Sequence, residues 1–356
     1  MDPFSSRRPL AFALAFLLTI LAVPLSASAQ LTPERLYVGL GQRLRVHVEA
    51  PPEYARDLRI TLRDPVTGAI LRETSAAAGD VDLAGLFPEI WTAPPRLVLA
   101  QLEVGTEPLG PPLVVQPMLT PDVAELRDPM TLSRTEDAAK GVPVFDSALR
   151  RIQATTGAEP AKASDRVFSG VRVYPERLVR LTTSLGEMTF RLRPDCAPNT
   201  AFNFMQLVGG GFYDGVLFHR VVNRLADGSR FVAQFGDPSG TGNGGPGYRL
   251  DLEPSPLEHG YGVLSMARAG DPNSAGSQVF ICLSRAGTAS LDGRYTAFAE
   301  LIDGAETLEA IAAVPTDRAD RPVDPPVIEH AELIEAPPVT KRARPIGAPP
   351  LTPAGR

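Results

Sequence analysis

Cysteine, histidine and tryptophan are scarce in this chain, which has two, four and one of them among 356 residues. Two cysteines, Cys196 and Cys282, are too few for the disulfide framework of a small secreted domain. One bridge between them stays open, because a sequence does not show whether the Cα atoms come close enough. The alternative is two small buried side chains. The histidines are scattered without metal-ligand spacing, so we expect no metal site.

The motifs of a hydrolase or a nucleotide-binding protein are also missing. The chain contains no G-x-S-x-G and no H-E-x-x-H, the patterns of many esterases and zinc peptidases. The glycine-rich stretch 242–247 lacks the Gly-Lys-Ser/Thr ending of a phosphate-binding loop. A formal net charge of −6 argues against a nucleic-acid partner. We therefore do not expect a hydrolase, an NTPase or a nucleic-acid-binding protein.

The first 29 residues have the pattern of a secretory signal peptide. Arg7 and Arg8 precede an apolar run over 10–25, and Ala27-Ser28-Ala29 offers a cleavage site before Gln30. An uncleaved membrane anchor is the rival, but the run is short for a span of about 20 residues. The paired arginines also resemble a twin-arginine signal, although general secretion is the preferred route. We expect a periplasmic or cell-envelope protein without stable membrane insertion.

Residues 30–118 have the pattern of a small β-sandwich-like domain. Leu44, Val46 and Val48 alternate with polar residues, and residues 58–62 repeat that alternation, which is typical of half-buried strands. Asp64-Pro65-Val66-Thr67-Gly68 is a plausible hairpin connection. The single tryptophan, Trp91, is predicted to be a core residue. We expect a spacer or docking role for this domain, since fold alone does not define function.

Two segments are predicted to lie outside the domains. Residues 119–174 are rich in Pro, Asp, Arg, Thr and Ala and are predicted to be a connector, although a connector this long could also pack across both domains. Residues 336–356 are rich in Pro, Ala and Arg and are predicted to be a disordered tail.

The remaining stretch, 175–335, contains short apolar runs joined by Gly, Pro, Asn and Asp, as expected of strands and loops. A helix is predicted over 201–208 and a second over 305–313. The informative blocks, in chain order, are Phe218-His219-Arg220, Phe231-Val232-Ala233-Gln234-Phe235-Gly236-Asp237, Leu264-Ser265-Met266-Ala267-Arg268-Ala269, Gly276-Ser277-Gln278-Val279-Phe280 and Leu291-Asp292-Gly293-Arg294-Tyr295.

These blocks, in this order, resemble the cyclophilin-type peptidyl-prolyl isomerases over residues 175–335. The resemblance implies a mainly β fold, a cyclophilin-like closed antiparallel eight-stranded β-barrel with two capping helices. It implies cofactor-free cis–trans isomerisation of X-Pro bonds in proline-containing polypeptides. For this chain we expect the clients to be exported proteins during folding, because uncatalysed isomerisation takes tens to hundreds of seconds. The oligomeric state stays open.

The resemblance assigns catalysis to Arg220 and Gln234. The X-Pro bond resists rotation by about 18–20 kcal/mol because the C–N bond has partial double-bond character. Rotation restores the lone pair of the prolyl nitrogen, and a donor aimed at that nitrogen stabilises the twisted state over both planar states. The permanent charge and planar donors of arginine suit this role. Read alone, Arg220 would be a surface ion-pair partner. His219 is predicted to be structural, because rotation needs no proton transfer.

The resemblance also assigns a substrate-binding set, although read singly each aromatic would be an ordinary core residue. Gln278 and Phe280 lie two apart on a predicted strand and therefore face the same side, while Val279 points into the barrel. The backbone of 267–269 matches the segment that pairs with extended peptides, and Arg268 is predicted to favour acidic neighbours of proline. The complete set is Phe231, Val232, Ala267, Arg268, Ala269, Gln278, Phe280, Leu291 and Tyr295.

The chain departs from the family pattern around the predicted pocket. Val232 replaces the usual methionine, Ser290 stands where many eukaryotic members have tryptophan, and Tyr295 stands where they have histidine. Residues 223–230 form a longer connection than is common and are predicted to be a lip beside the pocket. The alternative function, consistent with these departures, is a proline-peptide binding or chaperone module with weak or no turnover.

Overall fold

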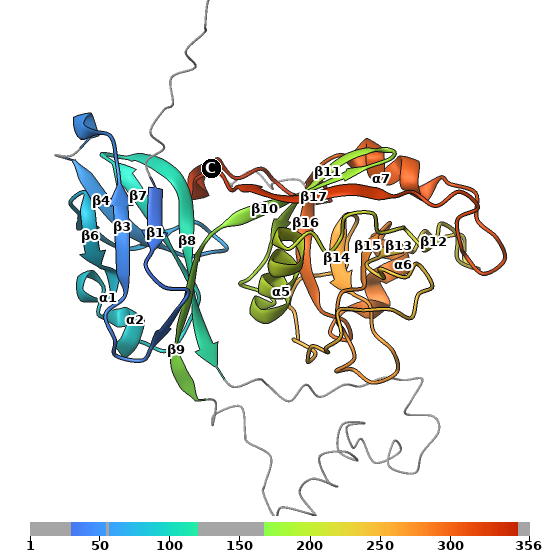
Figure 1. Ribbon diagram of the computed structural model, residues 1–356, viewed down its shortest axis with the longest axis horizontal. Helices are drawn as coiled ribbons and strands as arrows, with labels where there is room; N and C mark the ends of the chain where they lie inside the picture. Colours follow the sequence, from blue (N-terminus) through green and yellow to red (C-terminus); the bar gives the residue numbers. More distant parts are fainter. Residues whose placement is uncertain (1–29, 55–56, 120–166, 348–356) are drawn as a thin grey trace, which may run out of the picture.

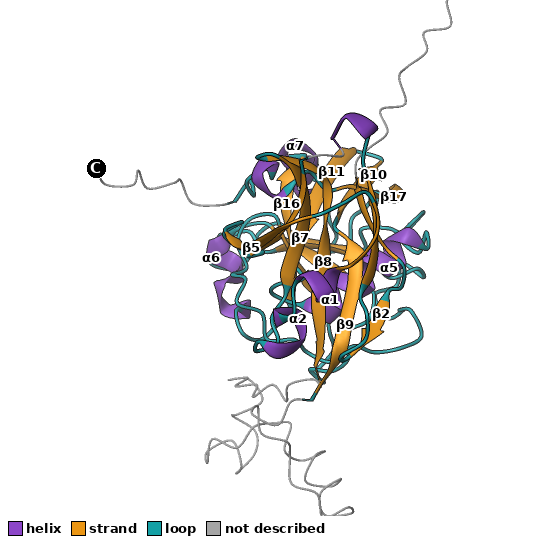
Figure 2. Ribbon diagram, turned by 90° about the vertical axis from the view of Figure 1, so that its left-hand side faces the viewer, coloured by secondary structure: helices purple, strands orange, loops and turns teal. Residues whose placement is uncertain are grey.

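The computed structural model describes residues 30–54, 57–119 and 167–347. The predicted signal peptide, most of the predicted connector and the last nine residues of the predicted tail lie outside the described residues. Among those described, no helix is both long and apolar enough to cross a membrane. The described chain forms two β domains side by side (Figure 1), with strands predominating over short helices (Figure 2).

The first domain consists of two antiparallel sheets that face each other. Its described strands form a smaller sheet in the order β1-β3-β6 and a larger one in the order β2-β9-β8-β7-β4-β5. The strands are β1 Gln30–Pro33, β2 Tyr37–Gly39, β3 Arg45–Glu49, β4 Leu58–Arg63, β5 Ile70–Ser75, β6 Gly79–Asp82, β7 Val98–Val104, β8 Glu107–Leu119 and β9 Phe168–Pro175, with short helices α1 Leu83–Leu86 and α2 Glu89–Thr92 and the turn η1 Pro52–Tyr54.

The core of this domain forms because alternate residues of each strand point inward. In β3, Val46 and Val48 are each 1% exposed, whereas the residues between them face solvent. They pack in one apolar cluster with Ile60 of β4 and Leu102 of β7. Trp91 is half-buried against this cluster and its ring centroid lies 6.1 Å from that of Phe168. The sandwich-like domain predicted from the alternation is present.

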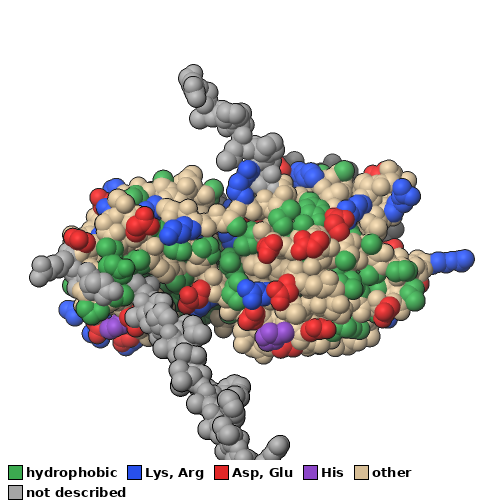
Figure 3. All heavy atoms as spheres, turned by 90° about the horizontal axis from the view of Figure 1, so that it is seen from above, with side chains coloured by type: hydrophobic (Ala, Val, Ile, Leu, Met, Phe, Trp, Pro, Cys, Tyr) green, Lys and Arg blue, Asp and Glu red, His purple; other side chains and the backbone are tan. Residues whose placement is uncertain are grey.

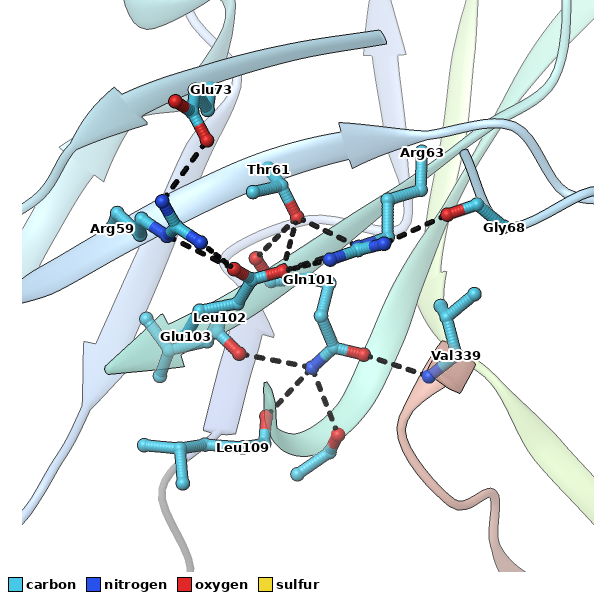
Figure 4. A network of polar contacts seen from close by, with 11 residues as sticks. Arg59, Thr61, Arg63, Gly68, Glu73, Gln101, Leu102, Glu103, Leu109 and Val339 are labelled. Carbon is cyan, nitrogen blue, oxygen red and sulfur yellow. Dashed lines mark hydrogen bonds and ion pairs between the residues drawn. The ribbon is translucent and has the colours of Figure 1, made fainter. Parts of the chain in front are cut away.

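The second face of β4 was predicted to be exposed but is buried under a polar network (Figure 4). The carboxylate of Glu103, 0% exposed, accepts from Thr61 Oγ1 at 2.9 Å and pairs with the guanidinium groups of Arg59 and Arg63. The neighbouring Gln101 accepts a hydrogen bond at Oε1 from the backbone N–H of Val339, at 3.2 Å. The C-terminal segment therefore covers part of this face.

The second domain is one curved antiparallel sheet. In the described residues its strand order is β12-β13-β15-β14-β16-β11-β10-β17. An isolated bridge between Leu217 and Val327, with reciprocal hydrogen bonds around Val216 and Ile328, joins its two ends. The strands are β10 Arg177–Thr183, β11 Gly186–Leu192, β12 Arg220–Val222, β13 Val232–Phe235, β14 Val263–Met266, β15 Val279–Cys282, β16 Ala297–Asp303 and β17 Ile328–Glu335.

Two helices cap this barrel, close to the predicted positions. Helix α5, Pro198–Gly209, buries Ala201, Phe204, Met205 and Val208, whose spacing defines one helical face. It begins three residues before the predicted start, because Pro198 suits the first turn and Glu253 accepts from the backbone N–H of Thr200. Helix α7, Ala305–Ala312, covers the other end. A short helix α6, Arg285–Thr288, continues into the turn η4 Ala289–Leu291.

Two segments that were predicted to lie outside the domains are partly folded in the structure. Residues 168–174 of strand β9 lie within the predicted connector, but the strand pairs with β8 along its length and leads into β10. After β17 the chain returns toward the first domain (Figure 1) through the turn η5, Val339–Lys341. Ala336 and Val339 are 4% and 8% exposed, so the first part of the predicted disordered tail is packed.

Candidate active site

The predicted catalytic residues lie in one row across neighbouring strands. Arg220 of β12 pairs with Gln234 of β13, and Gln234 pairs with Phe280 of β15. Directly paired residues of antiparallel strands project from the same face of a sheet. The intervening residues Ala233 and Val279 belong to the barrel core, as predicted for Val279. Strand periodicity therefore places the three site side chains on the outer surface of the barrel.

A cluster of apolar side chains at the predicted pocket positions lies next to this row. Val232, Phe280 and Leu291 are 2%, 5% and 8% exposed and form a cluster separate from the barrel core. The ring of Tyr295 meets that of Phe280 edge-on, with centroids 5.9 Å apart. Phe231 and Ala267 also pack against this cluster. The structure thus brings these predicted pocket residues together in one apolar cluster.

Sequence reasoning missed three contributors to the pocket. Leu225, from the long connection 223–230, packs against the cluster together with Leu257, and Val222 of β12 is a buried member of it. The connection itself closes on a hydrogen bond from the N–H of Leu225 to the oxygen of Ser229, at 2.8 Å. An isolated leucine within a polar loop was the available signal. The predicted lip therefore contributes an apolar side chain to the pocket.

A second compartment extends from the row along the glycine-rich loop. It is a cleft of about 570 Å³ whose lining includes Gln234, Gly244, Arg249 and Gln278. Gln234 Nε2 donates to Gln278 Oε1 at 3.0 Å, and Gln278 Nε2 donates to the oxygens of Gly242 and Gly244 at 2.9 Å. The two glutamines therefore connect the catalytic row to the loop and hold the cleft open.

The segment 267–269 borders the same cleft. The N–H of Ala267 donates to the oxygen of Gln278 at 2.9 Å, and the N–H of Ala269 donates to Ser274 Oγ at 2.9 Å. Both groups are engaged within the protein, so an extended peptide would pair with other backbone groups of this segment. The guanidinium of Arg268 lies 4.5 Å from the ring centroid of Tyr295 and donates to the oxygen of Arg294. Arg268 is thus held at the rim between pocket and cleft.

A buried polar chain supports the pocket from behind. His259 Nε2 lies 2.9 Å from Ser265 Oγ, and its Nδ1 lies 2.9 Å from Asp292 Oδ1. The imidazole also stacks on Phe280, with centroids 6.2 Å apart. Burial lowers the pKa of His259. Although burial opposes it, hydrogen bonds from Arg285 and His259 lower the pKa of Asp292 to about 2.

This serine, histidine and aspartate chain resembles a hydrolytic triad in connectivity but not in access. His259 and Ser265 are both 0% exposed, so the hydroxyl cannot reach a substrate carbonyl. The chain instead fixes the position of the Phe280 ring. The other buried histidine, His219, has no hydrogen-bond partner on either ring nitrogen among the described residues, and burial lowers its pKa. Both cysteines are buried free thiols.

The barrel brings an apolar cluster, a flanking cleft and one arginine together, an arrangement typical of proteins that bind peptides. The family described as cyclophilin type peptidyl-prolyl cis-trans isomerase/CLD matches residues 178–333. Peptidyl-prolyl cis-trans isomerase ppi1 of Schizosaccharomyces pombe is 45% identical over 152 residues, which are 41% of this chain and 92% of that protein. CYP18-2 of Arabidopsis thaliana is 41% identical over 162 residues, which are 44% of this chain and 93% of that protein.

The chain therefore belongs to the cyclophilin-type peptidyl-prolyl cis-trans isomerases. A crystal structure of a cyclophilin type isomerase of Cryptosporidium parvum, in the presence of the dipeptide Ala-Pro, matches with 37% identity and a TM-score of 0.40. That match covers 43% of this chain and 96% of the other. The family match begins in β10, so the β-sandwich-like domain lies outside it.

Proposed function

We propose that Arg220 catalyses rotation about X-Pro bonds by donating to the prolyl nitrogen as its lone pair returns. Gln234 lies directly opposite Arg220 in the sheet and would hold the substrate carbonyl. The single observation that carries this proposal is the shared row of Arg220, Gln234 and Phe280 beside the apolar pocket. A fixed cation there stabilises the twisted bond more than either planar state, which is what acceleration requires.

We propose proline-containing polypeptides as substrates. The proline ring would enter the pocket of Val232, Phe280 and Leu291, and the neighbouring residues would lie along the cleft beside 267–269. Val232 gives this pocket a shorter wall than methionine would. We further propose that Arg268 biases the cleft toward acidic neighbours of proline, because it fixes a positive charge at the rim.

The clients are proposed to be exported proteins that fold in the periplasm or cell envelope. The basic, apolar and Ala27-Ser28-Ala29 pattern of residues 1–29 supports this location. The test is to express the full chain and a form lacking 2–29, and to fractionate the cells. Export predicts that the full chain is shortened to a form beginning at Gln30 and released with the periplasm, whereas the shortened form stays inside. Retention of both would contradict it.

The catalytic proposal is tested by isomerisation of a short X-Pro peptide with protein beginning at Gln30. Arg220→Ala should remove most turnover while peptide binding and the unfolding midpoint change little. Phe280→Ala should instead weaken binding, because it empties the pocket. If wild-type protein binds the peptide but does not accelerate its isomerisation, the proline-peptide binding module becomes the better description.

A further inference from the structure

The proposed catalytic arginine has a carboxylate neighbour that lies outside the motif blocks quoted in the sequence analysis. Arg220 Nη2 lies 3.6 Å from Asp320 Oδ2, and the two side chains are 40% and 43% exposed. Asp320 lies about a hundred residues farther along the chain, in the loop between α7 and β17. Within the described residues it is the only carboxylate within 4.0 Å of the Arg220 guanidinium.

The backbone holds Asp320 in an uncommon conformation. Its φ is 59°, and it is the only described residue other than glycine with a positive φ. The backbone of a residue other than glycine rarely adopts a positive φ unless the surrounding structure imposes it, and such residues are often found at functional sites. Here the carboxylate of Asp317 accepts from the N–H groups of Ala319 and Arg321, at 2.8 and 3.0 Å. The turn is therefore fixed on both sides of Asp320.

The same turn is bonded directly to the arginine strand. The N–H of Val221, the residue after Arg220, donates to the oxygen of Asp320 at 2.8 Å. The next residue in the turn, Arg321, donates to the oxygen of Thr241 in the glycine-rich loop at 3.4 Å. The carboxylate and the guanidinium thus share a backbone connection, and their approach does not depend on long flexible side chains alone.

We propose that Asp320 is a positioning residue for Arg220 and that its charge makes the site reject acidic residues beside the proline. This rests on the role of Arg220 proposed above. A carboxylate at 3.6 Å restricts the rotamers of the guanidinium while leaving hydrogen-bond donors for the substrate. It also offsets the positive charge of Arg220, so an anionic side chain gains less attraction from the guanidinium and is repelled by the Asp320 carboxylate, whereas a neutral or basic side chain is not repelled.

Arg220 and Arg268 then give two positions in the site different preferences. Arg268 lies at the rim of the cleft with its charge unopposed by an ion pair among the described residues. Arg220 is paired. An acidic residue is therefore accepted where it lies beside Arg268 and rejected where it lies beside Arg220 and Asp320.

The test compares wild type with Asp320→Asn and Asp320→Gly, both of which suit a positive φ. The matched control is Asp324→Asn, which removes the same charge from an exposed position in the same loop. Each protein is assayed with peptides carrying Asn or Asp before or after the proline, at low salt and at 1 M salt.

We expect both Asp320 variants to lower kcat for the neutral peptides by about two- to fivefold with little change in KM. The effect is this small because the ion pair that they remove is partly exposed to solvent. For the peptide whose Asp lies beside Arg220 and Asp320, the selectivity of both variants against the acidic peptide should fall by a similar factor. High salt should move wild type toward the variants, and Asp324→Asn should match wild type. Unfolding midpoints of both variants should equal or exceed that of wild type.

Equal kinetics of wild type and the Asp320 variants would overturn the inference, as would equal losses on neutral and acidic peptides at every salt concentration. Arg220→Ala, assayed alongside, separates this failure from that of the catalytic proposal. Full activity in Arg220→Ala would refute the role of Arg220 itself. Loss of activity there, with unchanged Asp320 variants, would refute the role of Asp320 alone.

Discussion

The contact between the C-terminal segment and the junction of the two domains can be tested through one buried ion pair. Glu176, between β9 and β10, is 5% exposed, and its carboxylate accepts from Arg342 Nη2. Arg342 Nη1 also donates to the oxygen of Pro65 in the first domain, at 3.0 Å. Burial raises the pKa of Glu176, and Arg342 opposes this increase. Removing Arg342 would leave a carboxylate in the interior without its principal counter-charge.

We predict that Arg342→Met lowers the free energy of unfolding at pH 7 by about 3 kcal/mol. Breaking a buried ion pair from one side costs about 3–5 kcal/mol. The lower end applies because Arg191 also lowers the pKa of Glu176 and because methionine keeps the apolar stem in place. Urea denaturation, monitored by the fluorescence of Trp91, measures the change.

The direction of the Glu176 pKa shift determines how the stability deficit of Arg342→Met changes with pH. Glu176 has a folded pKa above its unfolded one, so protonation favours the folded state; this contribution is complete below the unfolded pKa and is lost as pH rises through the folded value. The deficit of Arg342→Met should therefore be largest at neutral pH, shrink as the pH falls toward the unfolded pKa of about 4.3, and stay small below it. Adding Glu176→Gln to Arg342→Met should recover much of the loss.

The matched control is Lys341→Ala, whose side chain is 60% exposed and lies 3.8 Å from Glu107. It should change stability by less than about 0.5 kcal/mol. The structural reasoning is refuted if Arg342→Met costs no more than Lys341→Ala at pH 7, or if its deficit grows as the pH is lowered.

Three further predictions concern the site. Gly236→Ala should lower the free energy of unfolding by more than about 2 kcal/mol, since the φ of Gly236 is 99° and a Cβ would lie 2.2 Å from the oxygen of Ser277. The control Gly245→Ala, which has open space around the added Cβ, should be nearly neutral in the same thermal melts. Wild type should lose stability as pH falls from about 4 toward 2 because Asp292 then becomes protonated, and Asp292→Asn should flatten this part of the profile in acid titrations. His259→Gln should raise KM for an X-Pro peptide more than it lowers kcat, because the mutation removes the imidazole stacked on Phe280 but no reacting group. An unchanged KM would count against this.

Local pattern was sufficient to predict much of the fold, whereas the candidate site was predicted from the resemblance of motif blocks to a known family. The alternation of Val46 and Val48 indicated β3, and the spacing of buried residues indicated α5. The pocket residues were predicted because each lies within a motif block that resembles the family, and read singly they would have been predicted as core residues. Such features are encoded within a few neighbouring residues, where strand and helix periodicity operate.

Features that depend on contacts between distant segments could not be predicted in the same way. Asp320 becomes relevant only when its loop lies beside β12. Glu103 is polar by sequence and yet 0% exposed, because two arginines and a threonine surround its carboxylate. Val339, in a proline-rich segment, is buried because it meets the first domain. Composition indicates the average behaviour of a segment but not which surface it meets.

The most direct test of the central claim is the rate of isomerisation of an X-Pro peptide by wild type, Arg220→Ala and Arg220→Lys, with peptide affinity and unfolding measured on the same samples. The account predicts rapid turnover in wild type and a loss of at least about tenfold in Arg220→Ala. It predicts little recovery in Arg220→Lys, since an ammonium lacks the planar fork of donors. Equal turnover in all three folded proteins would contradict the role of Arg220.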